Sequence, residues 1–209
     1  MQSYKLGLVW LRRDYRLEDN IAIINAIKQC EKIIICFIYD ENILNKLKAE
    51  DQRIPFIMNS IREVDNELNK YNSSLIVRYG NPCEEISNII DKYEINALFY
   101  NRDYEPYAKK RDEKIKNELN IPIITSKDSV IHEKNEIKTN NDGYYTVFTP
   151  YKNKWLNTDK ELKYAIKINE NNFLKINESS SIQEDRWYKL LNFNNRESFL
   201  KGGRKAGLL

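Results

Sequence analysis

Glycine, histidine and cysteine are all scarce in this chain of 209 residues, and each scarcity argues against a class of site. The six glycines form neither a G-x-G-x-x-G nor a G-x-x-x-x-G-K-[ST] sequence, so the usual glycine-rich cradles for dinucleotides and triphosphates are absent. With His132 as the single histidine, we expect no metal site. The three cysteines, Cys30, Cys36 and Cys83, are odd in number and form no C-x-x-C pair, which predicts reduced thiols.

The chain also lacks a dominant charge and any long apolar run. Lys and Arg number 34 against 31 Asp and Glu, and a net charge of +3 is too balanced for a protein that mainly neutralises nucleic-acid phosphates. No apolar stretch reaches the roughly 18 residues of a membrane span. The first eleven residues lack the features of a signal peptide. These absences predict a cytoplasmic protein with no membrane partner.

Strand and helix patterns alternate over the first 126 residues. Short runs of β-branched and aromatic residues predict five strands, over 5–11, 32–39, 74–79, 95–100 and 121–126. Apolar residues at helical spacing predict helices over 20–30 and 53–71, and two more that begin at Pro82 and Pro106. This alternation predicts the α/β class, with a doubly wound, Rossmann-like, five-stranded parallel sheet.

The pattern weakens after Lys127. We expect extended segments over 130–139, and a helix with Thr149 as its N-cap and Pro150 as its first residue. The polar, aperiodic stretch over 165–185 indicates a linker, and a short helical pattern resumes near the end. We therefore predict an α/β domain over 1–160, a linker over 161–197, and the start of another domain over 198–209.

The loops that follow the strands carry the candidate ligand-binding residues, because open parallel sheets bind ligands beyond the carboxyl ends of their strands. These loops, over 12–20, 40–42 and 101–107, combine arginines, carboxylates and tyrosines, which suits a planar, polar, partly anionic ligand. Arg–Asp pairs in a strand-to-helix loop more often lock the loop than contact a ligand, and the sequence leaves both interpretations open. We interpret the run Lys109–Lys114 as a solvated helix face, and His132 as a surface residue.

Four segments of the chain resemble motifs of the DNA photolyase/cryptochrome family. LVWLRRDYRLEDN (Leu8–Asn20), FYNRDYEPYAKKRD (Phe99–Asp112) and VFTPYKNKW (Val147–Trp155) are similar to its three N-terminal motifs, in order and with similar spacing. KGGRKAGLL (Lys201–Leu209) resembles the start of the first helix of the flavin-binding domain. The chain is thus identified as a member of this family, similar to the N-terminal domain of a class I-type deoxyribodipyrimidine photolyase.

The resemblance implies an antenna domain. In this family, an N-terminal α/β domain holds a light-absorbing chromophore and passes its energy to FAD in a C-terminal helical domain. In repair enzymes the excited, reduced FAD donates an electron to a cyclobutane pyrimidine dimer, so the whole protein is a carbon–carbon lyase. FAD, DNA and the lesion are bound by that helical domain, which is the expected partner. The sequence ends where the helical domain would begin, so we expect a fragment or truncated form that is not catalytic by itself.

The resemblance also selects site residues and chromophores. It implies that the antenna chromophore is bound by a set drawn from all three loops: Arg12, Asp40, Arg53, Asn101, Asp103, Glu105 and Tyr107. A deazaflavin is the first candidate, with FMN or methenyltetrahydrofolate as alternatives. Folate-binding members often carry Asn-Glu where this chain has Tyr107-Ala108, so this segment is more similar to that of deazaflavin-binding members and of members without an antenna. The alternative functions are a cryptochrome-type photoreceptor domain and a stand-alone nucleotide-binding module of the same fold.

Overall fold

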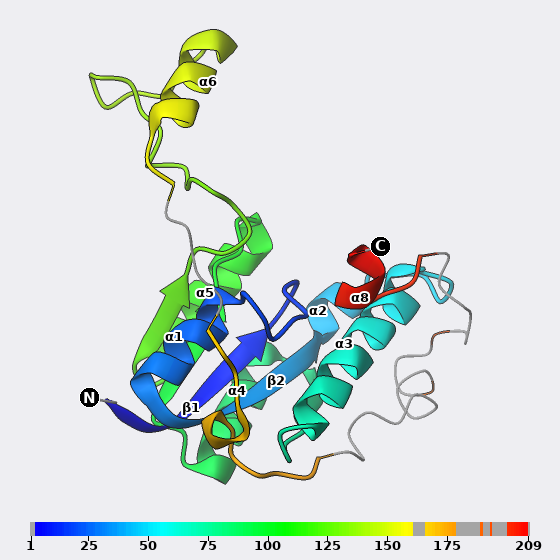
Figure 1. Cartoon of the computed structure of the whole chain (residues 1–209). Coiled ribbons are helices and arrows are strands. Elements are labelled where there is room, and N and C mark those ends of the chain that lie inside the picture. Colours follow the sequence, from blue (N-terminus) through cyan, green and yellow to red (C-terminus); the bar gives the residue numbers. More distant parts are fainter. Residues whose placement is uncertain (1–2, 161–165, 179–188, 190–192, 194–199, 209) are drawn as a thin grey trace.

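A parallel sheet of five strands, in the order β3-β2-β1-β4-β5, forms the centre of the structure (Figure 1). The structure is a computed structural model and describes residues 3–160, 166–178, 189, 193 and 200–208. Every strand lies within two residues of its predicted bounds, which confirms the fold class. The strands are β1 (Tyr4–Leu11), β2 (Cys30–Asp40), β3 (Leu75–Gly80), β4 (Ala97–Asn101) and β5 (Ile123–Ser126).

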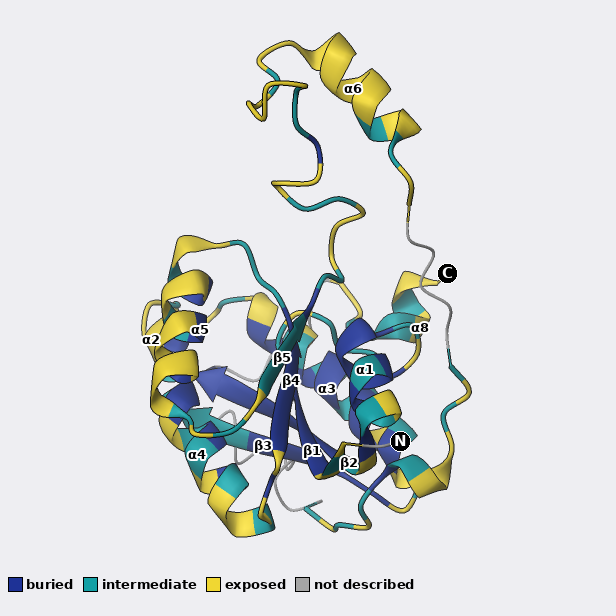
Figure 2. Cartoon of the chain, turned by 90° about the vertical axis from the view of Figure 1, so that its left-hand side faces the viewer, coloured by how far each residue is buried: buried dark blue, intermediate teal, exposed yellow. Residues whose placement is uncertain are grey.

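Helices cover both faces of this sheet. One face carries α1 (Ile21–Gln29) and α3 (Arg53–Asn69), and the other carries α4 (Pro82–Tyr93) and α5 (Pro106–Glu118) (Figure 1). Because both faces are covered, the central strands are buried along nearly their whole length (Figure 2). Pro82 and Pro106 stand at the first turns of their helices as predicted. A short helix that was not predicted, α2 (Glu41–Leu44), follows β2.

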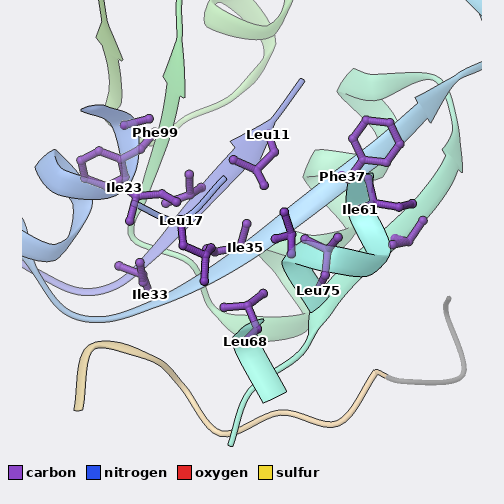
Figure 3. Packing of buried hydrophobic residues seen from close by; sticks show 14 of the residues in the cluster. Leu11, Leu17, Ile23, Ile33, Ile35, Phe37, Ile61, Leu68, Leu75 and Phe99 are labelled. Carbon is purple, nitrogen blue, oxygen red and sulfur yellow. The ribbon is translucent and has the colours of Figure 1, made fainter. Parts of the chain in front are cut away.

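The larger hydrophobic cluster lies between the sheet and the layer of α1 and α3 (Figure 3). Ile33 and Ile35 of β2 point into it, while Ile34 between them packs against α4 and α5 on the other face. Full burial of one such side chain stabilises the fold by about 1.5–3 kcal/mol. Asn20 starts α1 within this layer, because its side chain accepts from the amides of Ala22 and Ile23. The core thus fixes where each strand-to-helix loop begins.

The segment after β5 departs from the predictions. It contains no strand over 130–139; its backbone forms turns and bends instead. Helix α6 (Phe148–Asn157) has Val147 as its N-cap, so Pro150 lies third in the helix, where no intrahelical bond is lost. The prediction of a surface His132 was wrong, because its side chain is 3% exposed and meets Trp155 edge-on. Helix α6 buries none of its residues and projects away from the sheet (Figure 2).

Part of the predicted linker over 161–197 is bound to the sheet, and we call this part, residues 166–178, the strap. Within it, the 3₁₀ turn η1 (Glu170–Asn172) precedes Phe173, which is 1% exposed and stacks on Tyr71. The amide of Leu174 donates to the carbonyl of Ile33 at 3.0 Å. The last described element, α8 (Arg204–Gly207), lies on α3 (Figure 1). The division into domains stays a prediction, and Ser198 lies outside the described residues.

Among the helices described, none has the length and apolar character that a membrane crossing requires.

Candidate functional site

A cavity of about 360 Å³ lies at the carboxyl edge of the sheet, beyond β1, β2 and β4. This volume falls within the roughly 300–1,000 Å³ of small-molecule sites. Its apolar walls come from the ends of two strands, from α2 and the turn after it, and from α3. The main apolar contributors are Trp10, Phe37, Tyr39, Leu44, Leu47 and Ile57.

Six of the seven predicted site residues line this cavity, and they come from all three loops. They meet because parallel strands end at the same edge of a sheet. The six are Arg12, Asp40, Arg53, Asp103, Glu105 and Tyr107.

Asn101 lies outside the lining of this cavity and joins two loops instead. Its side chain is buried, donates to Oδ1 of Asn20 at 2.9 Å and accepts from the amide of Ala22 at 3.0 Å. It also donates to Asp14 in the first loop. Asn101 therefore fixes the loop after β1 to the end of β4, while an adjoining hollow of about 600 Å³ includes it in its lining.

Arg12 forms a rigid base for the cavity. Its Nη1 donates to both carboxylate oxygens of Asp112, at 2.7 and 2.9 Å. Its guanidinium carbon lies 5.0 Å from the ring centre of Trp10 and 4.8 Å from that of Tyr100. The two charges are almost fully withdrawn from water, with side-chain exposures of 7% and 11%, so each needs the other.

Asp40, Tyr107 and Arg111 form the second polar group of the wall. The hydroxyl of Tyr107 donates to Asp40 at 2.8 Å, and Arg111 Nη1 donates to the same carboxylate at 3.3 Å. Asp40 also caps α2 by accepting from the amide of Asn42. Burial, together with the bond to Asp40, raises the pKa of Tyr107 to about 12. Tyr107 is therefore a neutral hydrogen-bonding group at ordinary pH.

The interpretation of Lys109–Lys114 as a solvated face was wrong for two members of the run. The side chains of Arg111 and Asp112 are 10% and 11% exposed, and both join the buried ion pairs. Arg111 lines the cavity and is the site residue that sequence reasoning missed. Its spacing of four from Tyr107 was the available signal, because residues four apart share a helix face.

The outer rim of the cavity carries two exposed arginines, which form three ion pairs. Arg13 lies 2.8 Å from Glu105 and 3.3 Å from Asp103, and Arg53 lies 2.6 Å from Asp51. The bond from Arg53 lowers the pKa of Asp51. With their arginines 64% and 68% exposed, these pairs orient side chains but contribute little to stability.

The arrangement is suited to binding. The carboxylates of the wall are already paired with arginines or a tyrosine, which leaves no acid–base pair poised at an open position. Within the described residues, no group of three His, Cys, Asp or Glu side chains could hold a metal ion. An apolar slot with aromatic walls and fixed polar groups favours a ring system with a polar edge.

The fold is an α/β domain of the doubly wound type, and its cavity lies at the edge of the sheet where such domains bind ligands. Residues 7–167 match the DNA photolyase family, and the chain belongs to that family. This confirms the resemblance seen in the motifs and identifies the N-terminal domain of the family; the class I type stays a prediction.

Individual relatives include repair enzymes and cryptochromes. The chain is 27% identical over 151 residues to the deoxyribodipyrimidine photo-lyase of Synechococcus sp. strain PCC 6301, covering 71% of this chain and 31% of that enzyme. It is 26% identical over 131 residues to cryptochrome-2 of Gallus gallus, covering 61% and 22%. A photolyase structure from Sulfolobus tokodaii superposes with a TM-score of 0.76 at 28% identity, covering 97% of this chain and 45% of that one. The chain thus spans less than half of each of these three proteins.

Proposed function

We propose that this chain is the light-harvesting domain of a photolyase, and that the cavity at the carboxyl edge binds its antenna chromophore. The observation that carries the proposal is the convergence of six residues, implied by the family resemblance, on one cavity with aromatic walls. The S. tokodaii photolyase contains two FAD molecules, with the implication of a novel light-harvesting cofactor. A deazaflavin or flavin is the ligand class that this cavity favours.

Two buried donors at the cavity support a fit with such a ring. Trp10 Nε1 and Arg111 Nε have no hydrogen-bond partner in the part of the chain that the structure describes, and both residues belong to the cavity lining. Buried N–H groups without partners are costly, so a nearby carbonyl or ring nitrogen would relieve them after a small side-chain shift. The edge of a flavin or deazaflavin ring carries such acceptors.

The protein would hold the chromophore in a fixed position and orientation in the cavity. When bound, the chromophore would supply the absorption of near-ultraviolet or blue light. Arg12 and Asp112 hold the base rigid, Tyr107 and Arg111 present hydrogen bonds, and the apolar walls exclude water. FAD, DNA and the splitting of a cyclobutane pyrimidine dimer would belong to the helical domain of the longer protein.

A direct titration tests the proposal. The purified chain is mixed with a deazaflavin, FMN, methenyltetrahydrofolate or ATP, and the absorption band and fluorescence of each ligand are followed. We expect a shifted band and quenched fluorescence for a deazaflavin or FMN, weakened severalfold by Asp103→Ala or Arg53→Ala. Lys28→Ala, on the exposed face of α1, is the matched control. Absence of binding by every chromophore would refute the proposal.

A cryptochrome-type photoreceptor domain is a second candidate, supported by the similarity to the Gallus gallus protein. Both candidates predict chromophore binding, so the titration does not separate them. Dimer repair by the longer protein would favour the photolyase. Stabilisation by ATP without any chromophore binding would favour the nucleotide-binding module.

A further inference from the structure

A second hollow, of about 540 Å³, adjoins the chromophore cavity. It lies between the loop after β1, the first turns of α3, and α8. The two spaces share four lining residues, which are Arg13, Tyr15, Arg53 and Ile57. These residues therefore border both spaces, and a ligand lying across the rim between them would contact Arg13 and Arg53.

This space, which we call the arginine hollow, is lined by the positively charged side chains of Arg13, Arg16, Arg53 and Arg204 and by one carboxylate, Asp14. The carboxylates that pair with these arginines lie outside the lining, as Asp51 does with Arg53. A guanidinium has five N–H donors and the pair with Asp51 engages only Nε and Nη2, so donors remain for another ligand. The carboxylates therefore orient the arginines and leave some of their N–H donors available.

The wall that α8 contributes depends on close backbone contact with α3. A Cβ atom at Gly202 would lie 2.2 Å from the carbonyl oxygen of Phe56, so only glycine fits there. Gly203 has a φ of 106°, which other residues rarely adopt. These two glycines bring Arg204 to the hollow, where it lies 3.2 Å from Asp19.

We propose that the arginine hollow binds the phosphate-bearing tail of the chromophore whose ring lies in the cavity. The ligand class would then be a phosphorylated flavin or deazaflavin, not one with an uncharged tail. Guanidinium groups are the side chains best suited to phosphate, because they donate two parallel hydrogen bonds along with their charge. This inference rests on the proposed function, since it assumes that a ring occupies the cavity.

Three ligands with the same ring and different tails provide the test. Riboflavin, FMN and FAD carry no, one and two phosphates, and their dissociation constants for the chain are measured by fluorescence at low and high salt. We expect FMN and FAD to bind about tenfold more tightly than riboflavin at low salt, with a smaller preference at high salt. Arg204→Gln should remove most of that preference and leave riboflavin binding unchanged. Lys28→Gln removes the same charge at an exposed site on α1 and should change nothing.

The outcomes separate this inference from the proposed function. Equal affinity for all three flavins, or an equal loss for all three in Arg204→Gln, overturns the tail site while ring binding stands. Failure of every flavin and deazaflavin to bind refutes both. Circular dichroism of each variant shows whether it is folded. Arg16→Gln, at a residue that lines the hollow and not the cavity, provides a second substitution should Arg204→Gln disturb the docking of α8.

Discussion

Arg12 and Asp112 are a hundred positions apart in the sequence and form an ion pair beneath the cavity, in which Nη1 of Arg12 donates to both carboxylate oxygens, at 2.7 and 2.9 Å. The pair joins the loop after β1 to the middle of α5. Because α5 directly follows the loop after β4, the pair couples that loop to the loop after β1, and these two loops contribute much of the polar wall of the cavity.

Removal of Asp112 should destabilise the fold strongly. Asp112→Ala leaves the Arg12 guanidinium, 7% exposed, without its carboxylate, and an uncompensated buried charge costs about 3–5 kcal/mol. We expect a loss of this size in the free energy of unfolding, measured by urea denaturation. Asp91→Ala, on the exposed face of α4, is the control and should change it little. A loss below about 1 kcal/mol would show that the pair behaves like a surface ion pair.

Asn101 and Asp103 should separate stability from binding. Asn101→Ala removes a side chain that donates to Asn20 and accepts from Ala22, so we expect the free energy of unfolding to fall by about 1–3 kcal/mol. Asp103→Ala removes an exposed pair with Arg13 and should leave stability unchanged while weakening chromophore binding. Denaturation and ligand titration of both variants check this. Equal effects of the two substitutions on stability would contradict the assignment.

Tyr107 gives a pH-dependent prediction at the alkaline end. Its pKa is raised from 10.0 to about 12, so the bond from its hydroxyl to Asp40 stabilises the fold fully below pH 10. That contribution is lost as the pH rises through about 12. The phenolate absorbance of the wild type minus that of Tyr107→Phe should therefore show a step near pH 12. A step near pH 10 would mean that Tyr107 titrates as a free phenol. At neutral pH, Tyr107→Phe should cost about 1 kcal/mol.

Gly202 should control whether α8 stays on α3. Gly202→Val places side-chain atoms where the carbonyl of Phe56 lies, so we expect residues 203–208 to lose protection in hydrogen exchange. Gly207→Val is a matched control, because a Cβ there has no atom within 4 Å. Unchanged protection in Gly202→Val would show that the close approach is not required for docking.

The strands and the long helices could be predicted because their signals are local. The continuous apolar run of β2 and the periodic apolar stripe of α3 each span enough residues to be recognised, whereas the four residues of α2 do not. The location of the site followed from the rule for parallel sheets. Which polar residues lock the loops and which face the cavity depends on distant contacts, such as the bond from Asn101 to Asn20, 81 positions away.

The arginine hollow lay beyond sequence reasoning for the same reason. The need for glycine at position 202 arises from the backbone of α3 and not from its own neighbours.

Arg111, in the wall of the chromophore cavity, was hidden in a charged run, because most members of that run do face solvent. The pattern of charges alone does not distinguish the buried members of the run from the exposed ones.

The strap adds a requirement for anyone who wishes to express the smallest folded piece of this protein. Phe173 belongs to the same cluster as Ile33 and Leu68, and the amide of Leu174 continues the hydrogen bonding of β2. A polypeptide that stops at residue 160 would contain all the strands and long helices that the structure describes, yet it would leave an aromatic-sized gap beside Tyr71. The folded unit is therefore longer than a diagram of strands and helices suggests. Because Phe193 is buried in the same cluster, cloning boundaries should be placed after residue 193.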